Sequence, residues 1–134
     1  MRILYCLLIA AGLLFAGFSN DKPQKNIRLF DGKTFNGWEG DTANTWRIVN
    51  GELIGGSLTQ TVPHNEFIST DRSYNNFVLT LKFKLLGTEG FINTGVQFNS
   101  KRLVEPPYEM TGYQADLGEG FWGCLYDESR RNKI

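Results

Sequence analysis

Apolar and polar side chains alternate along residues 77–86 with a period of two. The odd positions carry the apolar set Phe77, Leu79, Leu81, Phe83 and Leu85. Because successive side chains of a β-strand point to opposite faces, this alternation is typical of a strand with one buried face. We therefore predict a half-buried strand here, with the odd positions in the core and Thr80, Lys82 and Lys84 in water.

The same period recurs in two later segments. The apolar positions of residues 91–99 are Ile92, Thr94, Val96 and Phe98, and the polar positions between them are Asn93, Gln97 and Asn99. In residues 113–117, Gln114 and Asp116 alternate with Tyr113, Ala115 and Leu117. These patterns predict two further strands. We expect their polar side chains to share one open sheet surface.

Turn residues separate the predicted strands. Asn50-Gly51 stands between residues 45–49 and 52–54, and Asn-Gly favours the left-handed turn of a two-residue β-hairpin. No segment after residue 19 shows a helical repeat of apolar residues. Several short strands with turns between them predict an all-β fold, a sandwich or jelly roll of two antiparallel sheets.

The N-terminal segment differs from the rest of the chain. Arg2 precedes a run of apolar and small residues without charge, and Gly17-Phe18-Ser19 follows the small-x-small pattern of a cleavage site. We predict a signal peptide over residues 1–19, a linker over 20–26 and one domain over 27–134. The run of about 16 apolar residues is shorter than the ~20 of a membrane-spanning helix, so cleavage is preferred to an uncleaved anchor. The mature protein is then secreted or periplasmic, with no stable membrane span.

Composition narrows the function classes. The chain has 134 residues with 14 basic and 14 acidic side chains, which indicates one ordinary domain and argues against a nucleic-acid partner. Only two cysteines are present, and Cys6 lies in the predicted signal peptide. Cys124 alone cannot form a disulfide framework, so the fold depends on its hydrophobic core.

Five segments in order resemble the 3-keto-disaccharide hydrolase domain family. They are LFDGKTFNGW at 29–38, WRIVNGELIGG at 46–56, NEFISTDRSYNNFVLTLKFKL at 65–85, NTGVQFNS at 93–100 and TGYQADLGEGFWGCLYDESRRNK at 111–133. The resemblance implies a concanavalin A-like β-sandwich and cleavage of glycosides that carry a ketone at carbon 3. Family members are longer, so we expect residues 27–134 to be a partial domain, incomplete at the C-terminus.

The acidic residues argue against one familiar glycosidase mechanism. The resemblance also extends to secreted glucanases of the laminarinase and lichenase type, which read Glu-x-Asp-x-x-Glu on one strand to supply a nucleophile and an acid about 5 Å apart. Here the corresponding residues are Gln114, Asp116 and Glu119. Glutamine cannot be the nucleophile, and in a regular strand Glu119 faces away from the other two.

A 3-keto sugar offers a different route, because the ketone acidifies the proton on carbon 2 and allows the group on carbon 1 to leave by elimination. That route needs a base, a donor to the enolate oxygen and an acid. We predict Asp116 as the base, with Gln114, Asn93 and Gln97 as neutral hydrogen-bonding groups that bind the substrate. The competing interpretation of each residue alone is a solvated strand position.

His64 is the only histidine, and Glu66 stands two residues further on. Its usual pKa suits proton transfer, so we predict His64 and Glu66 as catalytic candidates beside Asp116, although a lone histidine is more often a surface residue. One histidine with scattered carboxylates argues against zinc. We predict no cofactor or metal site, while calcium stays possible because nothing in the sequence specifies or excludes it.

Trp122, Arg130 and Arg131 complete the predicted substrate-binding set. Trp122 is preferred to Tyr113 and Trp38 as a stacking surface for sugar. Tyr113 alternates in step with Ala115 and Leu117, so we expect its side chain to point into the core. Arg130 and Arg131 follow Asp127-Glu128-Ser129, and either bind hydroxyls or a ketone at the rim of a cleft or form local ion pairs on a solvated turn.

Two functions are compatible with these residues. The first is an exported enzyme that cleaves 3-keto-glycosides with a base, as the resemblance implies. The second is a lectin-like sandwich that binds carbohydrate through amides and an aromatic ring without turnover. Release of free sugar from a 3-keto-disaccharide separates the two.

Overall fold

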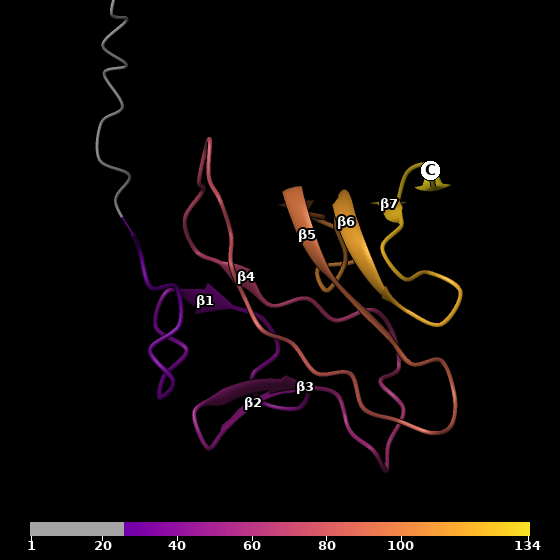
Figure 1. Ribbon diagram of the computed structural model, residues 1–134, viewed down its shortest axis with the longest axis horizontal. Helices are drawn as coiled ribbons and strands as arrows, with labels where there is room; N and C mark the ends of the chain where they lie inside the picture. The colour runs from indigo at the N-terminus through magenta and orange to yellow at the C-terminus, as the bar shows by residue number, and fades with distance from the viewer. Residues whose placement is uncertain (1–25) are drawn as a thin grey trace, which may run out of the picture.

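The computed structural model describes residues 26–134 (Figure 1). The predicted signal peptide, residues 1–19, lies outside this range, as does all but the last residue of the predicted linker, 20–26. The expectations about these two segments therefore stay predictions.

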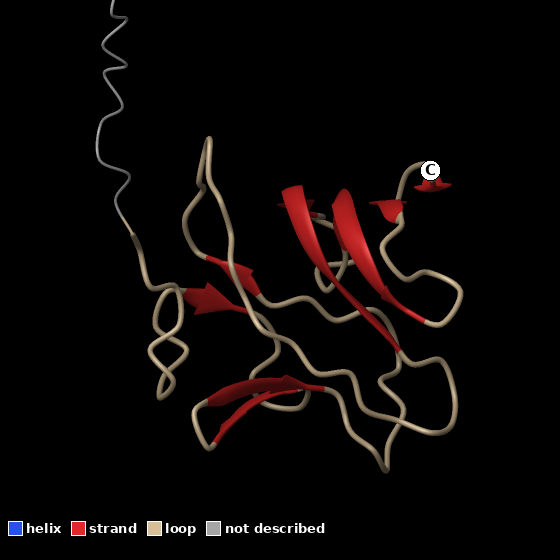
Figure 2. Ribbon diagram, in the orientation of Figure 1, coloured by secondary structure: helices blue, strands red, loops and turns tan. Residues whose placement is uncertain are grey.

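Every regular element in the described part of the chain is a β-strand (Figure 2). The strands are β1 (Trp38–Glu39), β2 (Trp46–Val49), β3 (Glu52–Gly55), β4 (Ser69–Thr70), β5 (Asn93–Arg102), β6 (Met110–Gly118), β7 (Leu125–Glu128) and β8 (Asn132–Lys133). All strand pairs are antiparallel. The predicted all-β fold is confirmed, and the architecture is consistent with the expected concanavalin A-like sandwich.

The strands form three hydrogen-bonded sheets. β1 pairs with β4, β2 pairs with β3, and β5, β6, β7 and β8 form one sheet in that order. In Figure 1, β5, β6 and β7 lie side by side, and the β2–β3 hairpin lies at the lower edge of the view, away from the C-terminus. The four-stranded sheet carries both of the predicted polar strands, so it is the part of the fold that positions a site.

The turn between β2 and β3 has the predicted hairpin geometry. Val49 pairs with Glu52, which leaves Asn50 and Gly51 as the two-residue turn, with φ angles of 51° and 82°. Left-handed backbone at both central residues defines the type I′ turn that Asn-Gly favours. Local chemistry therefore determines this hairpin, as expected from the sequence.

Replacing Gly51 by Ala is expected to lower the free energy of unfolding by about 1 kcal/mol, because a Cβ disfavours the left-handed conformation. Urea unfolding followed by tryptophan fluorescence measures the change. Gly51→Asn is the control, since asparagine tolerates positive φ, and it should cost less than Gly51→Ala. Equal stability of Gly51→Ala and the wild type contradicts this account of the turn.

Residues 77–86 do not form the predicted strand. The segment has no ladder partner in the part of the chain that the structure describes, and Phe77, Leu81 and Phe83 are about half exposed. The odd-numbered apolar side chains nevertheless point to one side, as expected. Phe77, Leu79 and Leu81 face Val96 and Phe98 of β5 across a hollow of about 470 Å³. The prediction was wrong about pairing because alternation determines which face is apolar but supplies no neighbouring strand.

Burial along β6 is inverted relative to the sequence expectation. Met110, Gly112, Gln114, Asp116 and Gly118 are buried, whereas the intervening positions are half-buried or exposed. At the Met110 end of this face, Arg102 of β5 donates hydrogen bonds to the carbonyls of Phe67, Pro107 and Tyr108, and Asn65 donates to Glu128. The polar surface is therefore covered by chain, and the expectation that it lies open to water was wrong.

Candidate functional site

Six polar side chains share one face of β5, β6 and β7, which we call the polar face. Its residues are Asn93, Gln97, Gln114, Asp116, Tyr126 and Glu128. In the β5–β6 ladder, Gly95 lies opposite Asp116 and Gln97 opposite Gln114, and in the β6–β7 ladder Tyr126 lies opposite Gln114. Asn93, Gln97, Gln114 and Asp116 therefore share a face as predicted.

Asp116 and Asn93 form the best-defined contact of the polar face. The Asn93 Nδ2 atom donates to Asp116 Oδ1 at 2.8 Å, and the backbone N–H of Leu117 donates to the same oxygen at 2.9 Å. Within residues 26–134, Oδ2 of Asp116 accepts no hydrogen bond. Only 3% of Asp116 is exposed, so the carboxylate lies almost out of water with one oxygen fixed and the other free of protein partners.

Gly95 makes room for Gln114 on this face. A Cβ at position 95 would clash with Cγ and Cδ of Gln114, so the glutamine side chain crosses β5 where only glycine fits. The neighbouring Gln97 has both amide atoms buried and without hydrogen-bond partners among the described residues. Two amides thus lie on the face that carries Asp116, and one of them has unsatisfied polar atoms in a buried position.

Glu128 adds a second carboxyl group that the sequence interpretation left without a role. Burial raises the pKa of Glu128, and the charges of Glu109 and Asp116 raise it further. Asn65 Nδ2 bridges Glu128 Oε1 and Glu109 Oε2 at 3.3 and 3.4 Å. In the β6–β7 ladder, Glu128 points to the same face as Gln114. A prediction of the register of this hairpin from the sequence would have placed Glu128 on the polar face.

His64 and Glu66 lie together beside the Asn65 bridge. His64 Nδ1 is 3.2 Å from Glu66 Oε1 and 3.0 Å from the Asn65 carbonyl oxygen, and the imidazole stacks on Tyr108 with ring centroids 3.6 Å apart. Two acceptors at Nδ1 assign the proton of the neutral ring to that nitrogen, which leaves the lone pair on Nε2. The predicted proximity of the two side chains is confirmed, while their catalytic role stays a prediction.

Trp122 lies apart from the polar face. It is exposed and tilted against Phe83 at 6.4 Å, and it lines a hollow of about 290 Å³ together with Glu119 and Ile92. Ile92 belongs to the apolar set of the 91–99 segment, and neither this hollow nor the one beside β5 includes Asp116 or Glu128 in its lining. The structure therefore does not bring Trp122 together with the predicted amides and aspartate.

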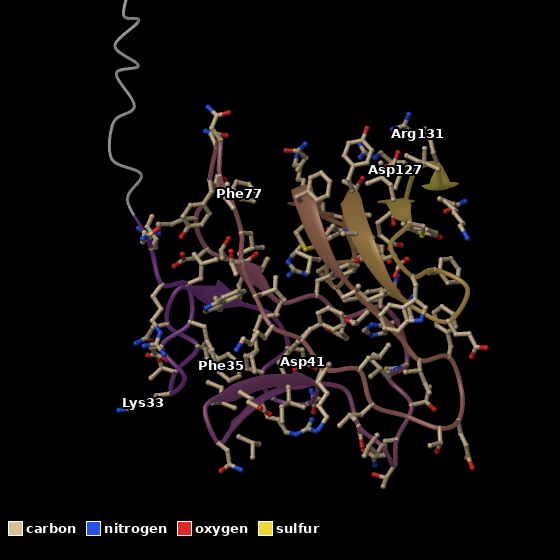
Figure 3. The ribbon with its side chains drawn as sticks, in the orientation of Figure 1. Lys33, Phe35, Asp41, Phe77, Asp127 and Arg131 are labelled. Atoms are coloured by element: carbon tan, nitrogen blue, oxygen red, sulfur yellow. The ribbon has the colours of Figure 1, made fainter. Side chains whose placement is uncertain are left out.

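Arg130 and Arg131 also lie apart, on the face opposite to Asp116. Their Nε atoms donate to Oδ1 and Oδ2 of Asp127 at 2.5 and 2.6 Å, and Figure 3 labels Asp127 and Arg131 close to the C-terminal strands. Arg131 also donates to the Tyr113 hydroxyl. Burial acts to raise the pKa of Asp127, but the hydrogen bonds from Arg131 and Arg130 outweigh it and hold the pKa below its usual value. The alternative of local ion pairing is confirmed, although Asp127 itself is buried rather than solvated.

Residues 26–134 contain no group of three or more His, Cys, Asp and Glu side chains arranged to hold a metal ion. No helix in the same range is long and apolar enough to cross a membrane.

Comparison with known proteins identifies the family. Neither curated proteins nor solved structures gave a match to this chain. A family model described as the 3-keto-alpha-glucoside-1,2-lyase-like domain matches residues 25–133, which is about four-fifths of the chain. The chain therefore belongs to the 3-keto-alpha-glucoside-1,2-lyase-like domain family, in agreement with the resemblance found in its sequence.

Proposed function

We propose that this protein cleaves 3-keto-glycosides by elimination across carbons 1 and 2, and that the polar face is its active site. The family description supports the reaction, since a 1,2-lyase breaks the bond to the leaving group on carbon 1 and removes a proton from carbon 2. The proposed setting is outside the cytoplasm, which rests on the predicted signal peptide over residues 1–19.

The observation that carries the proposal is a pair of carboxyl groups in different environments on neighbouring strands. Asp116 is nearly buried and bound by Asn93, whereas burial and two nearby acidic residues raise the pKa of Glu128. Pairs of titratable groups whose surroundings separate their proton affinities are suited to acid and base roles in one reaction. Asp116 is assigned as the base and Glu128 as the acid.

The proposed reaction conserves protons. Asp116 Oδ2 takes the proton from carbon 2, and the electrons of that bond form the enolate of the carbon 3 ketone. The enolate then collapses to a double bond between carbons 1 and 2 as the bond from carbon 1 to the leaving oxygen breaks. Glu128 transfers its proton to that oxygen.

Neutral donors would hold the sugar during this step. Asn93, Gln114 and Gln97 carry N–H groups suited to the ketone oxygen, where negative charge develops, and to the ring hydroxyls. The unsatisfied amide of Gln97 supports this role. His64 is about one third exposed at its side chain and is oriented by Glu66, so we assign this pair to removing a proton from the water that adds to carbon 1 afterwards.

The proposal predicts a specific pH dependence. Glu128 must be protonated to act, and its raised pKa extends the protonated form to higher pH, so kcat should fall as the pH rises through that pKa. Replacing Glu128 by Gln removes the transferable proton and should lower kcat about 100-fold while abolishing this limb of the pH profile. Release of methanol from methyl 3-keto-α-glucoside measures the rate.

Glu119→Gln is the matched control, because Glu119 is an exposed carboxylate beside Trp122 rather than on the polar face. It should leave both kcat and the pH profile unchanged. Wild-type protein that releases neither methanol from methyl 3-keto-α-glucoside nor free sugar from a 3-keto-disaccharide contradicts the proposed function. An unchanged profile in Glu128→Gln contradicts the assignment of the acid alone.

A second candidate function is carbohydrate binding without turnover. The neutral amides of the polar face support it, because they can bind sugar hydroxyls without moving a proton, and both amide atoms of Gln97 have no hydrogen-bond partner among the described residues. Calorimetry with a 3-keto-disaccharide distinguishes the two functions. Saturable binding without product release supports binding alone, whereas release of free sugar supports the enzyme.

A further inference from the structure

One amide group links two carboxyl groups at the Met110 end of the polar face. Asn65 Nδ2 donates to Glu128 Oε1 at 3.3 Å and to Glu109 Oε2 at 3.4 Å. The two accepting oxygens therefore lie within two hydrogen-bond lengths of each other. Glu128 lies opposite Gly112 in the β6–β7 ladder, and Glu109 directly precedes β6. The strand register thus brings both carboxyl groups to the same end of the sheet.

Glu109 is fixed by a second contact. Its Oε1 atom accepts a hydrogen bond from the backbone N–H of Met110 at 2.9 Å, while Oε2 accepts the one from Asn65. The side chain is half-buried, and each of its oxygens has a donor. The carboxylate therefore cannot turn away from Glu128 without losing a hydrogen bond.

No cation neutralises this pair of carboxyl groups within residues 26–134. Neither Glu109 nor Glu128 forms an ion pair there, and Arg102, which contacts the same segment, donates to backbone carbonyls and pairs with Glu39. The other titratable groups of this region are Asp116 of β6, Tyr126 of β7 and the His64–Glu66 pair beside Asn65. A negative charge beside a half-buried carboxyl group favours the protonated form of that group.

Two charges favour the proton on Glu128, and they behave differently in the proposed reaction. Burial raises the pKa of Glu128 most, and the charges of Glu109 and Asp116 raise it further. Asp116 loses its charge when it takes the proton from carbon 2. Glu109 takes no part in that transfer, so of the two charges only that of Glu109 persists until the leaving group departs.

We infer that Glu109 is a positioning residue for the proposed acid, and that its fixed carboxylate keeps the proton on Glu128 until the leaving oxygen takes it. This inference rests on the proposed function and adds a residue to it. Glu109 moves no proton in the proposed reaction and acts only through Glu128. The charge at position 109 therefore sets the upper limit of the pH range in which the protein turns over substrate.

The test follows Glu128 directly, by carbon NMR of the full chain labelled at its glutamate carboxyl groups and titrated without substrate. Glu128→Gln identifies the Glu128 signal. Glu109→Gln removes the charge at nearly constant length and should lower the midpoint of the Glu128 titration by about one pH unit. The falling limb of kcat against pH should move by the same amount with little change in KM, so that kcat above both midpoints is about tenfold below the wild type.

Two further variants separate charge from contacts. Glu109→Asp keeps the charge and should shift the midpoint less than Glu109→Gln. Glu52→Gln is the matched control, because Glu52 is an exposed carboxylate on β3, in a different sheet. It should leave both the Glu128 midpoint and the kcat profile unchanged. Glu109→Ala removes the charge without placing a second amide beside Asn65, and it is the readout if Glu109→Gln fails to fold by circular dichroism.

The failure of this inference is distinguishable from the failure of the proposed function. An unchanged Glu128 midpoint without the Glu109 charge overturns the inference alone, whether or not the protein is active. A shift in Glu109→Asp as large as in Glu109→Gln also overturns it, because contacts rather than charge then set the midpoint. A midpoint that moves while the kcat limb stays in place overturns it together with the assignment of Glu128 as the acid. Wild-type protein that cleaves neither methyl 3-keto-α-glucoside nor a 3-keto-disaccharide overturns the proposed function and the role of Glu109 with it.

Discussion

Replacing Asp127 by Asn is expected to lower the thermal unfolding midpoint by roughly 10 °C or more. The Asp127 side chain is completely buried, and its two oxygens accept hydrogen bonds from Arg130 and Arg131. Asparagine turns an N–H donor towards one of the guanidinium donors, so the buried asparagine N–H has no acceptor there and both arginines lose their counter-charge. Differential scanning calorimetry measures the change.

Asp71→Asn is the control for this prediction, because the Asp71 side chain is more than half exposed and makes only a long contact to Arg72. Its unfolding midpoint should stay close to the wild-type value. An Asp127→Asn variant that unfolds at the wild-type temperature shows that the buried cluster contributes nothing to stability.

The same cluster predicts how stability depends on pH. The pKa of Asp127 is lower in the folded protein than its usual value, so this group stabilises the fold above the usual aspartate pKa of about 3.9. That contribution is lost as the pH falls towards the folded-state pKa, because the carboxylate must then be protonated in place. Asp127→Asn should therefore flatten the stability profile below about pH 4, and a profile as steep as the wild type contradicts the assignment.

Features decided by neighbouring residues could be predicted from the sequence. Asn50 and Gly51 favour one turn geometry regardless of the rest of the chain, and that turn forms. The face to which each side chain of residues 93–97 and 114–116 points also follows from the period of two in a strand. Asn93 and Asp116 were therefore expected on one face, and they are hydrogen-bonded to each other there.

Features that depend on distant segments were not predictable in this way. The alternation of residues 77–86 is the most regular in the chain, yet the segment stays unpaired in the structure, because a ladder needs a partner that local pattern does not specify. Burial of Gln114 and Asp116 was missed for the same reason. Burial depends on contacts between distant segments, such as the hydrogen bonds from Arg102 to Phe67 and Ser69, which join residues more than thirty positions apart.

The run Asp127-Glu128-Ser129-Arg130-Arg131 illustrates the same distinction. Pairing of Asp127 with Arg130 and Arg131 is local, at spacings of three and four residues, and was among the expectations. Asp127 and Glu128 are consecutive residues of β7 and therefore point to opposite faces, but only the β6–β7 register places Asp127 on the Tyr113 side and Glu128 on the polar face. A charged run that reads as one solvated turn thus contributes a buried ion cluster on one face and a candidate acid on the other.

Replacing Asp116 by Asn is expected to lower kcat for 3-keto-glucoside cleavage about 1,000-fold or more, the range lost with a general base. The substitution suits this test because Asn Oδ1 can accept both hydrogen bonds that Asp116 Oδ1 now accepts, from Asn93 Nδ2 and Leu117 N. The fold should therefore survive. Only Oδ2, which has no partner among the described residues, is exchanged for a group that cannot take a proton.

The readouts separate a base from a residue that merely supports the sheet. Loss of a base lowers kcat and leaves KM and the unfolding midpoint close to the wild type, whereas loss of a structural contact raises KM or lowers the midpoint. Binding of a 3-keto-disaccharide should persist in Asp116→Asn, and Asp71→Asn should retain full activity. Unchanged turnover in Asp116→Asn removes this carboxylate from the chemistry, and the His64–Glu66 pair, which has a free Nε2 atom and a fixed orientation, is then the next candidate for the base.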